Sequence, residues 1–499
     1  MKKINARMVF HIICIVLRFN GLFIILSSLV GFLYKEESAL NMLWSGLLVV
    51  GLSFINLLFK RDEKKTLNKR DGYLIVALSW VVLTISGAFP YLFTGAIPNF
   101  TNAAFESISG FTTTGSSILS DIEAMPKGIL FWRSMTHWLG GMGIIVLAVA
   151  ILPLLGIGGM QLFVAEAPGP SADKLAPRIA DTAKRLWFLY MALTGIQSVL
   201  LKIAGMNWFD AINHALCTLS TGGFSTKNNS VAYWNDSPVI QYIIIAFMLI
   251  AGANFVLTYF ALKGKVRKLF GNEEFKYYLG IVLGFTIIST LAIYFFADPS
   301  QSSIDHPMVL GEFESAFRHS LFQVLAVITT TGFVSADFTM WTPFLTVLFF
   351  GMMFLGGSAG STSGGVKFVR HIIMIKNGMM EYKRLLHPNA ILPVRFGGRA
   401  VKQTIVYNIL GFFVIYMSFF IVGALTLSLL GLDFTSAIGG SATSLGNVGP
   451  GLGIISPVDN FASLPDAGKW VCSFLMIIGR LELFTFLIIL TPYFWSDKY

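Results

Sequence analysis

Four short runs of threonine or serine end in glycine at similar intervals along the chain. The glycines at positions 115, 222, 332 and 446 are separated by 107, 110 and 114 residues, which indicates four related units. Hydroxyl groups and glycine within apolar sequence suit a loop whose backbone carbonyls replace the water shell of an ion. We therefore predict four filter segments around one pore. The predicted filter residues are Thr113, Thr114, Gly115, Ser220, Thr221, Gly222, Thr330, Thr331, Gly332, Ser444, Leu445 and Gly446.

A glycine-rich run later in the chain predicts a break in a membrane helix. Broken backbone at membrane depth is tolerated where it is buried in protein or lines a water-filled cavity, so we interpret the run as a gate below the filter. Because Lys367 and Arg370 follow closely, a flexible cytoplasmic loop is the alternative. The predicted gate residues are Gly356, Gly357, Ser358, Ala359, Gly360, Ser361, Thr362, Ser363, Gly364 and Gly365.

One arginine, Arg480, lies inside the apolar stretch from Val471 to Phe484. A centrally placed arginine costs at least about 2.5 kcal/mol on insertion and is expected to have a function. Glu482 is two residues away and therefore on a different helix face, which argues against a local pair. We predict that Arg480 belongs to the gate as an electrostatic barrier. A salt bridge to a neighbouring helix is the alternative.

The sequence contains no recognisable catalytic or nucleotide-binding motif. His137, His214 and His319 lie in or near apolar segments without H-E-x-x-H spacing, and no phosphate-binding glycine motif is present. We therefore expect that the chain is not an enzyme and binds no nucleotide. An intramembrane enzyme is the rival class, and turnover of a peptide or lipid by the purified protein would support it.

Two repeated elements would position the filter segments. A short helix before each segment points its carbonyl end at the membrane centre, where the partial negative charge favours a cation. A glycine inside the helix after each segment weakens or bends that helix. The short helices are predicted to begin near Phe100, Phe209, Phe317 and Phe434. The mid-helix glycines are Gly140, Gly252, Gly357 and Gly479.

The composition predicts an all-α integral membrane protein, with 55% hydrophobic and 12% charged residues. Basic residues concentrate between spans, so the basic loops and both termini are predicted to be cytoplasmic. A nucleic-acid surface is disfavoured because aromatics are not interleaved with the basic residues. We predict ten spans, at about 9–33, 38–59, 72–94, 127–155, 184–204, 238–262, 276–297, 343–376, 401–430 and 468–492.

The spans divide into an N-terminal pair and four helix, pore loop, helix repeats. The predicted boundaries are 1–70 for the pair and 71–173, 174–263, 264–378 and 379–499 for the repeats, with the gate in the third. The acidic residues of the filter loops, among them Asp298, are predicted to face outside.

Taken together, the TTTG, STGG, TTTG and SLGNVGPGLG segments, the GGSAGSTSGG break and the IGRLELF segment resemble the Trk/Ktr/HKT superfamily of potassium transporters. The extra N-terminal pair is most similar to bacterial TrkH-type subunits. The resemblance implies potassium uptake across the bacterial inner (plasma) membrane, with potassium at the filter, an intramembrane gate loop and a homodimer. It also implies a cytosolic, nucleotide-binding regulatory ring of the TrkA type. The family's filter glycines match Gly115, Gly222, Gly332 and Gly446, and its pore arginine matches Arg480. Leu445 departs from the threonine of the other segments.

The predicted function is inward passage of potassium down its electrochemical gradient. A membrane potential of about 100 mV supplies about 2.3 kcal/mol per charge, without ATP at the pore. A sodium- or proton-coupled symporter of the same fold is the alternative. The basic loops at 174–185, 263–276 and 376–399 could dock an acidic rim of the regulatory ring or rest on anionic lipid headgroups.

Overall fold

The computed structural model describes residues 4–58, 68–143, 179–297, 304–481 and 483–496. Within these ranges the regular secondary structure is helical apart from one antiparallel hairpin, in which β1 (Arg395–Phe396) pairs with β2 (Arg399–Ala400). Several sequence predictions fall outside the description. These are part of the basic loop at 174–185, the span ends at residue 59 and at 144–155, Asp298 and Glu482.

The N-terminal pair consists of α1 (Ala6–Leu33) and α2 (Ser38–Ser53), followed by the 3-10 turn η1 (Phe54–Leu58). Glycines allow α1 and α2 to pack closely, since a Cβ at Gly21 would lie 2.7 Å from the Val50 side chain. The loop between them attaches to the first repeat, because the Glu36 carboxylate accepts a hydrogen bond from the Gly128 amide at 3.0 Å. The pair therefore flanks the first repeat.

The remaining helices follow the order long helix, short helix, loop, second helix four times. The first group contains α3 (Lys69–Gly87), α4 (Phe89–Phe93), α5 (Phe100–Phe111), α6 (Lys127–Trp138) and the π-helical turn η2 (Leu139–Gly143). The second contains α9 (Ile179–Ile203), α10 (Trp208–Leu219), η3 (Ser230–Trp234), α11 (Pro238–Gly252) and α12 (Phe255–Leu262). The third begins with the short helix α13 (Val266–Gly271) and contains α14 (Glu273–Phe296), α15 (Glu312–Ile328), α16 (Pro343–Met352) and α17 (Phe368–Leu386). The fourth contains α18 (Gln403–Leu429), α19 (Phe434–Gly446), η5 (Gly453–Ile455), η6 (Phe461–Ser463), α20 (Asp466–Arg480), α21 (Leu483–Leu490) and α22 (Pro492–Trp495).

Three of the short helices begin within one residue of the predicted starts, but α15 does not. It begins at Glu312, five residues before Phe317. Gly311, with φ of 104°, precedes this start, and Glu312 and Glu314 in the first turn complement the positive end of the helix dipole. The acidic residues extend the helix beyond the apolar pattern on which the prediction rested.

Six helical segments of the described chain are long and apolar enough to cross a membrane, and the pair α11 and α12, bent by 115°, would make a seventh. The predicted spans at 343–376 and 468–492 are instead broken, and the span at 127–155 enters a π-helical turn. The breaks coincide with the predicted mid-helix glycines. Gly140 lies in η2, Gly252 ends α11, Gly357 follows α16, and Gly479 precedes the end of α20.

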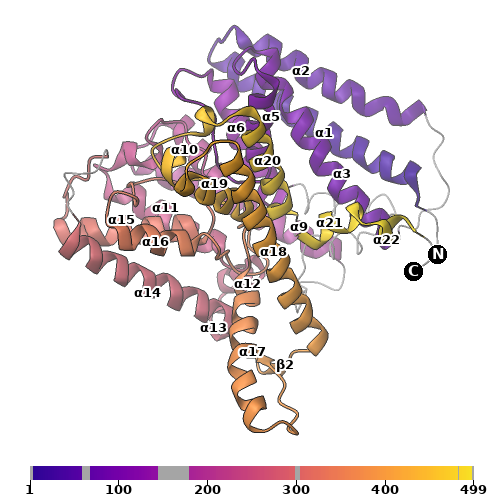
Figure 1. The fold of residues 1–499 in the computed structure, drawn as a ribbon. Coiled ribbons are helices and arrows are strands. Elements are labelled where there is room, and N and C mark those ends of the chain that lie inside the picture. Colours follow the sequence, from indigo (N-terminus) through magenta and orange to yellow (C-terminus); the bar gives the residue numbers. More distant parts are fainter. Residues whose placement is uncertain (1–3, 59–67, 144–178, 298–303, 482, 497–499) are drawn as a thin grey trace.

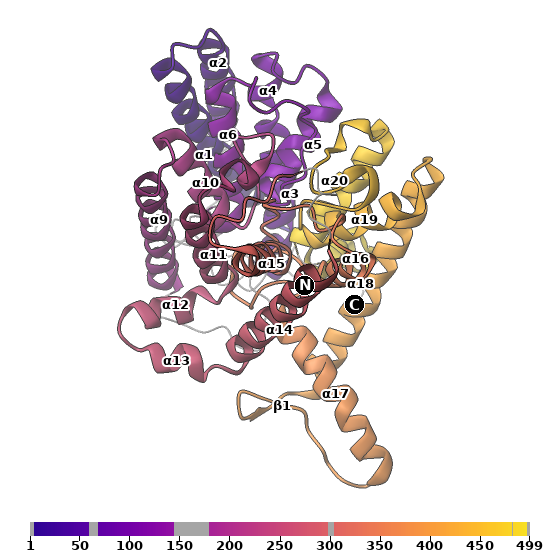
Figure 2. The same cartoon turned by 90° about the vertical axis from the view of Figure 1, so that its left-hand side faces the viewer.

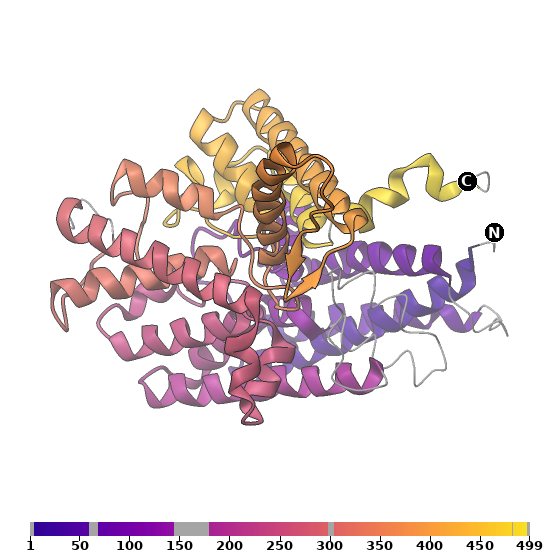
Figure 3. The same ribbon diagram turned by 90° about the horizontal axis from the view of Figure 1, so that it is seen from below.

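The short helices lie among the long ones, and one element projects away from the rest. In Figure 1 the N-terminal helices lie at the right and α14 to α16 at the left. Figure 2 shows that α17 and its β-hairpin extend below the other helices, and Figure 3 shows this hairpin from below. Both ends of the described chain meet the start of α3. The Asn5 amide donates to Asp71 at 2.9 Å, and Arg70 donates to the Ser496 carbonyl at 2.8 Å.

Candidate functional site

Each short helix ends in a residue with left-handed backbone conformation. The φ angles are 54° at Thr113, 54° at Thr221, 55° at Thr330 and 54° at Asn447. A positive φ is rare for a β-branched residue such as threonine, and strain of this kind concentrates at functional sites. The amide of the following residue reaches back to the helix, as when Thr114 donates to the Ser109 carbonyl at 2.9 Å. This Schellman-type ending turns the chain out of the helix at the same point in all four repeats.

Four non-helical segments follow, at 114–118, 222–226, 331–335 and 448–452, and we call them the filter strands after their predicted role. They close into a ring. The second residue after each left-handed position is a glycine with positive φ, and its Cα lies against the backbone carbonyl of the next repeat. There is no room for a side chain at these positions. A Cβ added at Gly115 would lie 2.2 Å from the backbone oxygen of Gly222, and one at Gly223 would lie 2.1 Å from that of Thr331. A Cβ at Gly332 would lie 2.2 Å from the backbone oxygen of Val448, and one at Gly449 would lie 2.7 Å from that of Thr114. The fourth strand thus meets the first, and four carbonyl oxygens belong to one closed ring.

In the second and fourth repeats, the positive-φ glycine lies later in the chain than the glycine that the sequence motif predicted. Gly223, not Gly222, has the positive φ of 83° that corresponds to Gly115, so this segment is shifted by one residue. In the fourth repeat Gly449 corresponds to Gly115, three residues after Gly446. Ser444, Leu445 and Gly446 lie in α19 instead of the strand. The sequence motif was recognised by its hydroxyl residues. In the fourth repeat, however, the left-handed residue is Asn447, and asparagine tolerates this conformation.

The hydroxyl groups of the first and third strands form local hydrogen bonds. Thr112 and Thr114 hydroxyls lie 2.8 Å apart, and those of Thr329 and Thr331 lie 2.7 Å apart. Asn447 donates from Nδ2 to the Thr114 hydroxyl at 3.0 Å, which joins the fourth strand to the first. These contacts hold the strand side chains in place around the ring of carbonyl oxygens.

A buried polar side chain of each of the first three short helices holds the outgoing strand. The Glu106 carboxylate accepts a hydrogen bond from Ser117 at 3.0 Å, and His214 Nε2 lies 2.9 Å from the Ser225 hydroxyl. In the third repeat Gln323 donates to the Ser335 hydroxyl at 3.4 Å. In the fourth, Gly439 lets the backbone of the strand approach the helix. A Cβ there would lie 2.6 Å from the Leu452 amide nitrogen. No sequence motif marks Glu106 or Gln323, because each is one of several polar residues in its short helix.

The predicted gate residues form a non-helical loop between α16 and α17. The Gly356 amide donates to the Val366 carbonyl at 2.9 Å, which closes the loop on itself. The loop also contacts the second repeat, because the Thr362 hydroxyl donates to the Leu219 carbonyl at 2.9 Å. The Gly364 amide donates to the Thr330 hydroxyl at 2.7 Å and so contacts the third filter strand directly. The run therefore contacts the second and third repeats next to the ring, instead of forming a free loop.

Arg480 joins the gate loop to the π-helical turn of the first repeat. Its guanidinium donates to the backbone carbonyls of Thr362 at 2.8 Å, Gly140 at 2.9 Å and Gly141 at 3.0 Å. Because α20 ends at Arg480, the side chain lies at the break of its own helix. The structure thus brings residues of the predicted gate and Arg480 together next to the ring of carbonyl oxygens.

A cavity separate from the ring lies between the N-terminal pair and the first two repeats. Its volume is about 1060 Å³, and residues of the α1–α2 loop and of the loops after the first two short helices line it. Lys227 in this region forms an ion pair with Glu123 at 2.9 Å. Burial opposes the charge of the ammonium group, but the Glu123 carboxylate outweighs this effect and raises the pKa of Lys227. The filter and gate residues do not contribute to the lining, so the cavity is separate from the ring.

Comparison with known proteins gives one consistent result. The profile of the TrkH family, described as cation transport protein, matches residues 46–499. The Trk system potassium uptake protein TrkH of Escherichia coli K12 is 42% identical over 97% of this chain and 98% of its own length. The TrkH protein of Salmonella typhimurium is also 42% identical, over 97% of this chain and 98% of that protein. The crystal structure of the potassium transporter TrkH from Vibrio parahaemolyticus superposes with a TM-score of 0.86 at 37% identity, covering 99% of this chain and 100% of that one.

These matches confirm the predicted family and the all-helical membrane fold. They identify a multi-pass membrane protein and a transporter instead of an enzyme. The chain belongs to the TrkH family of cation transport proteins.

Proposed function

We propose that this chain forms the potassium-uptake pore of a bacterial Trk system. The closed ring of four backbone carbonyls at the ends of four short helices carries the proposal. Such carbonyls can replace the water shell of a cation, and the helix carbonyl ends add negative potential there. The names of the similar proteins, which are potassium uptake proteins, support potassium as the transported ion.

The filter in this proposal is formed by the strands that end the short helices. Potassium binds to the carbonyls that precede the four positive-φ glycines. The residues that the sequence predicted for the filter have several roles in this proposal. Thr113, Thr221 and Thr330 turn the chain out of the short helices, and Gly222 contributes its carbonyl oxygen. Ser220 closes the C-terminal end of α10, and Ser444, Leu445 and Gly446 lead into the fourth strand from α19.

The gate in this proposal is the loop of residues 356–365 together with Arg480. Three backbone carbonyls hold the arginine across the path below the ring, where its positive charge opposes a passing cation. Opening of the gate has to break the hydrogen bond between Gly364 and Thr330 and the hydrogen bonds that Arg480 donates. A regulatory partner can drive this change only by binding the open and closed states with different affinity.

The assembly we propose is a homodimer in the inner membrane with a cytosolic TrkA-like ring. Trk-system relatives support a partner of this kind. The ring, and not this chain, binds nucleotide, while membrane lipid surrounds the helices and nucleic acid is no partner. Both termini lie in the cytoplasm. Their common attachment to the start of α3 supports a position on the same side. The repeat boundaries at 71–173, 174–263, 264–378 and 379–499 belong to this proposal.

Uptake into liposomes tests the function and separates it from coupled transport. Purified protein should admit potassium or rubidium under an inside-negative potential, without a sodium or proton gradient. Uptake that requires one of those gradients would instead favour the symporter of the same fold. Protein-free liposomes are the control, and equal uptake with and without protein would contradict the proposal.

A further inference from the structure

An ion pair of the first repeat lies buried behind the filter and contacts the second repeat. Arg133 of α6 donates from Nε to the carboxylate of Glu106 of α5 at 2.7 Å. The side chains are 1% and 0% exposed, and no other ion pair given for the described ranges has both partners so deeply buried. Two charges removed from water are costly unless each is paired and hydrogen-bonded, so their retention needs a reason.

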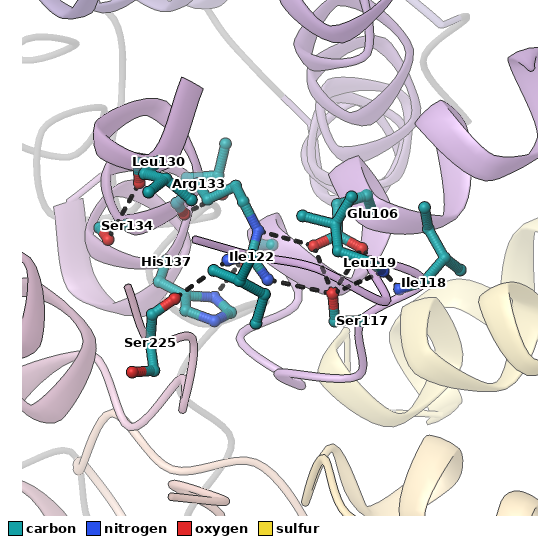
Figure 4. Close-up of polar contacts among 12 residues, drawn as sticks. Glu106, Ser117, Ile118, Leu119, Ile122, Leu130, Arg133, Ser134, His137 and Ser225 are labelled. Atoms are coloured by element: carbon teal, nitrogen blue, oxygen red, sulfur yellow. Dashed lines mark hydrogen bonds and ion pairs between the residues drawn. The ribbon is translucent and has the colours of Figure 1, made fainter. Parts of the chain in front are cut away.

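Both members of the pair contact the strands that leave the ring (Figure 4). The Glu106 carboxylate accepts hydrogen bonds from the Ser117 hydroxyl at 3.0 Å and the Ile118 amide at 2.9 Å, both in the first strand. Arg133 donates from Nη2 to the Ser117 hydroxyl at 3.1 Å. From Nη1 it donates to the Ser225 carbonyl at 3.1 Å, in the second strand. The pair therefore connects two filter strands two residues beyond their glycines.

The arginine also fixes the residue that follows the second glycine. Its guanidinium carbon lies 3.9 Å from the ring centroid of Phe224, an arrangement typical of a cation–π contact. His137 also stacks on Phe224, with ring centroids 4.0 Å apart. His137 Nδ1 lies 2.7 Å from the Gly110 carbonyl at the end of α5. Phe224 thus contacts two side chains of α6.

The other strand connections given by the structure use neutral groups. Asn235 donates to the Ser335 carbonyl at 3.1 Å between the second and third repeats. The Phe461 amide donates to the Ser117 carbonyl at 2.8 Å between the fourth and first. Arg133 differs because a planar guanidinium with several donors holds two partners at fixed separation, which a neutral side chain does less well.

We propose that Glu106 and Arg133 are positioning residues that set the separation of the first two filter strands and thereby the preference for potassium over sodium. This inference rests on the proposed function. A ring of carbonyls discriminates between ions through its size and the field of its dipoles, and supporting residues have to hold such a site to within about 0.5 Å. Neither side chain contacts the ion in this account.

Three variants test the role: Glu106→Gln, Arg133→Gln and the double variant E106Q/R133Q. The double variant leaves no unpaired charge, so it remains informative if a single variant fails to fold. Glu123→Gln is the matched control, because Glu123 pairs with Lys227 between the same two repeats but at the surface. The readout is the potassium-to-sodium permeability ratio of monodisperse protein in liposomes, measured together with total flux.

Positioning predicts a fall of the ratio by about threefold or more in both single variants and in the double variant, with the control unchanged. An electrostatic role predicts a different pattern, because Glu106→Gln removes a negative charge near the filter whereas Arg133→Gln removes a positive charge. Opposite changes of flux at an unchanged ratio would overturn the inference. So would an unchanged ratio in all folded variants. A wild-type protein that conducts no potassium would instead refute the proposed function itself.

Discussion

Thr113, Thr221 and Thr330 adopt a backbone conformation that β-branched residues usually avoid. The surrounding helix ends and hydroxyl contacts hold them there, and the glycine two residues later completes the turn. Glycine is required for two reasons at this point. Its φ is positive, and a Cβ would overlap a carbonyl of the neighbouring strand.

We expect Gly115→Ala to lower the potassium-to-sodium permeability ratio by about tenfold. A left-handed alanine costs about 1–2 kcal/mol, and the added Cβ would also lie 2.2 Å from the Gly222 oxygen, so the ring must shift. Gly95→Ala is the control, because Gly95 has a φ of 71° but nothing within 4 Å of an added Cβ. Ion-flux ratios in liposomes measure the effect. An equal ratio in Gly115→Ala and Gly95→Ala would contradict this role of Gly115.

The residue scale also shows where sequence reasoning reached its limit. In the first and third segments, spacing and residue type indicated Gly115 and Gly332, which have positive φ in the structure and follow a run of threonines. The second segment offers two glycines, Gly222 and Gly223, and only the backbone distinguishes them. In the fourth segment Asn447 and Val448 replace threonines, so hydroxyl groups no longer marked the register.

At the scale of elements, the second helix of each repeat breaks close to its mid-helix glycine. The glycine positions were readable from the sequence, because glycine weakens helices and each lies a similar distance into its span. The conformation at each break could not be predicted from the sequence, because it depends on contacts with residues of other repeats. At Gly140 the helix becomes a π-turn that Arg480 contacts, whereas at Gly357 it opens into the gate loop.

The gate loop and the third filter strand share one hydrogen bond, which gives a test of their coupling. We expect Thr330→Val to raise basal potassium flux, because the Gly364 amide loses its acceptor in the closed state. A buried donor without a partner costs about 1–3 kcal/mol, so the closed state should be destabilised by that order.

Thr221→Val is the matched control for this test. Thr221 has the same left-handed conformation, but its hydroxyl donates to the neighbouring Ser220 carbonyl instead of contacting the loop. Flux through single proteins in planar bilayers would show the difference as a change in open probability. If both variants opened equally, the Gly364 contact would have no specific part in closing the pore.

At the scale of the whole molecule, we predict that basic residues concentrate on the cytoplasmic face of the transporter. The predicted cytoplasmic side carries α13, where Lys265, Arg267 and Lys268 are exposed. Lys268 lies 4.2 Å from the ring centroid of Phe260, so part of this basic surface is held on α12. The sequence predicted the basic cluster, but the bend of 115° between α11 and α12 that carries it appears only in the structure.

We expect reversal of Lys265, Arg267 and Lys268 to glutamate to weaken binding of a TrkA-like ring by about tenfold or more at moderate salt, because complementary charges steer and hold such contacts. Lys35→Glu, in the loop between α1 and α2, is the control on the predicted outer side. Co-purification and titration with the soluble ring measure the loss. Unchanged ring binding accompanied by reduced binding to anionic lipid would show that the cluster serves the membrane instead.

The central claim, that four backbone carbonyls form one potassium site, is tested most directly by locating the ion. Crystals grown with rubidium in place of potassium would be measured at the rubidium absorption edge, with sodium-grown crystals as the control. The account predicts an anomalous peak on the axis of the ring, within coordination distance of the carbonyls of Thr114, Gly222, Thr331 and Val448. A ring without a peak, or rubidium bound only away from these four oxygens, would contradict it.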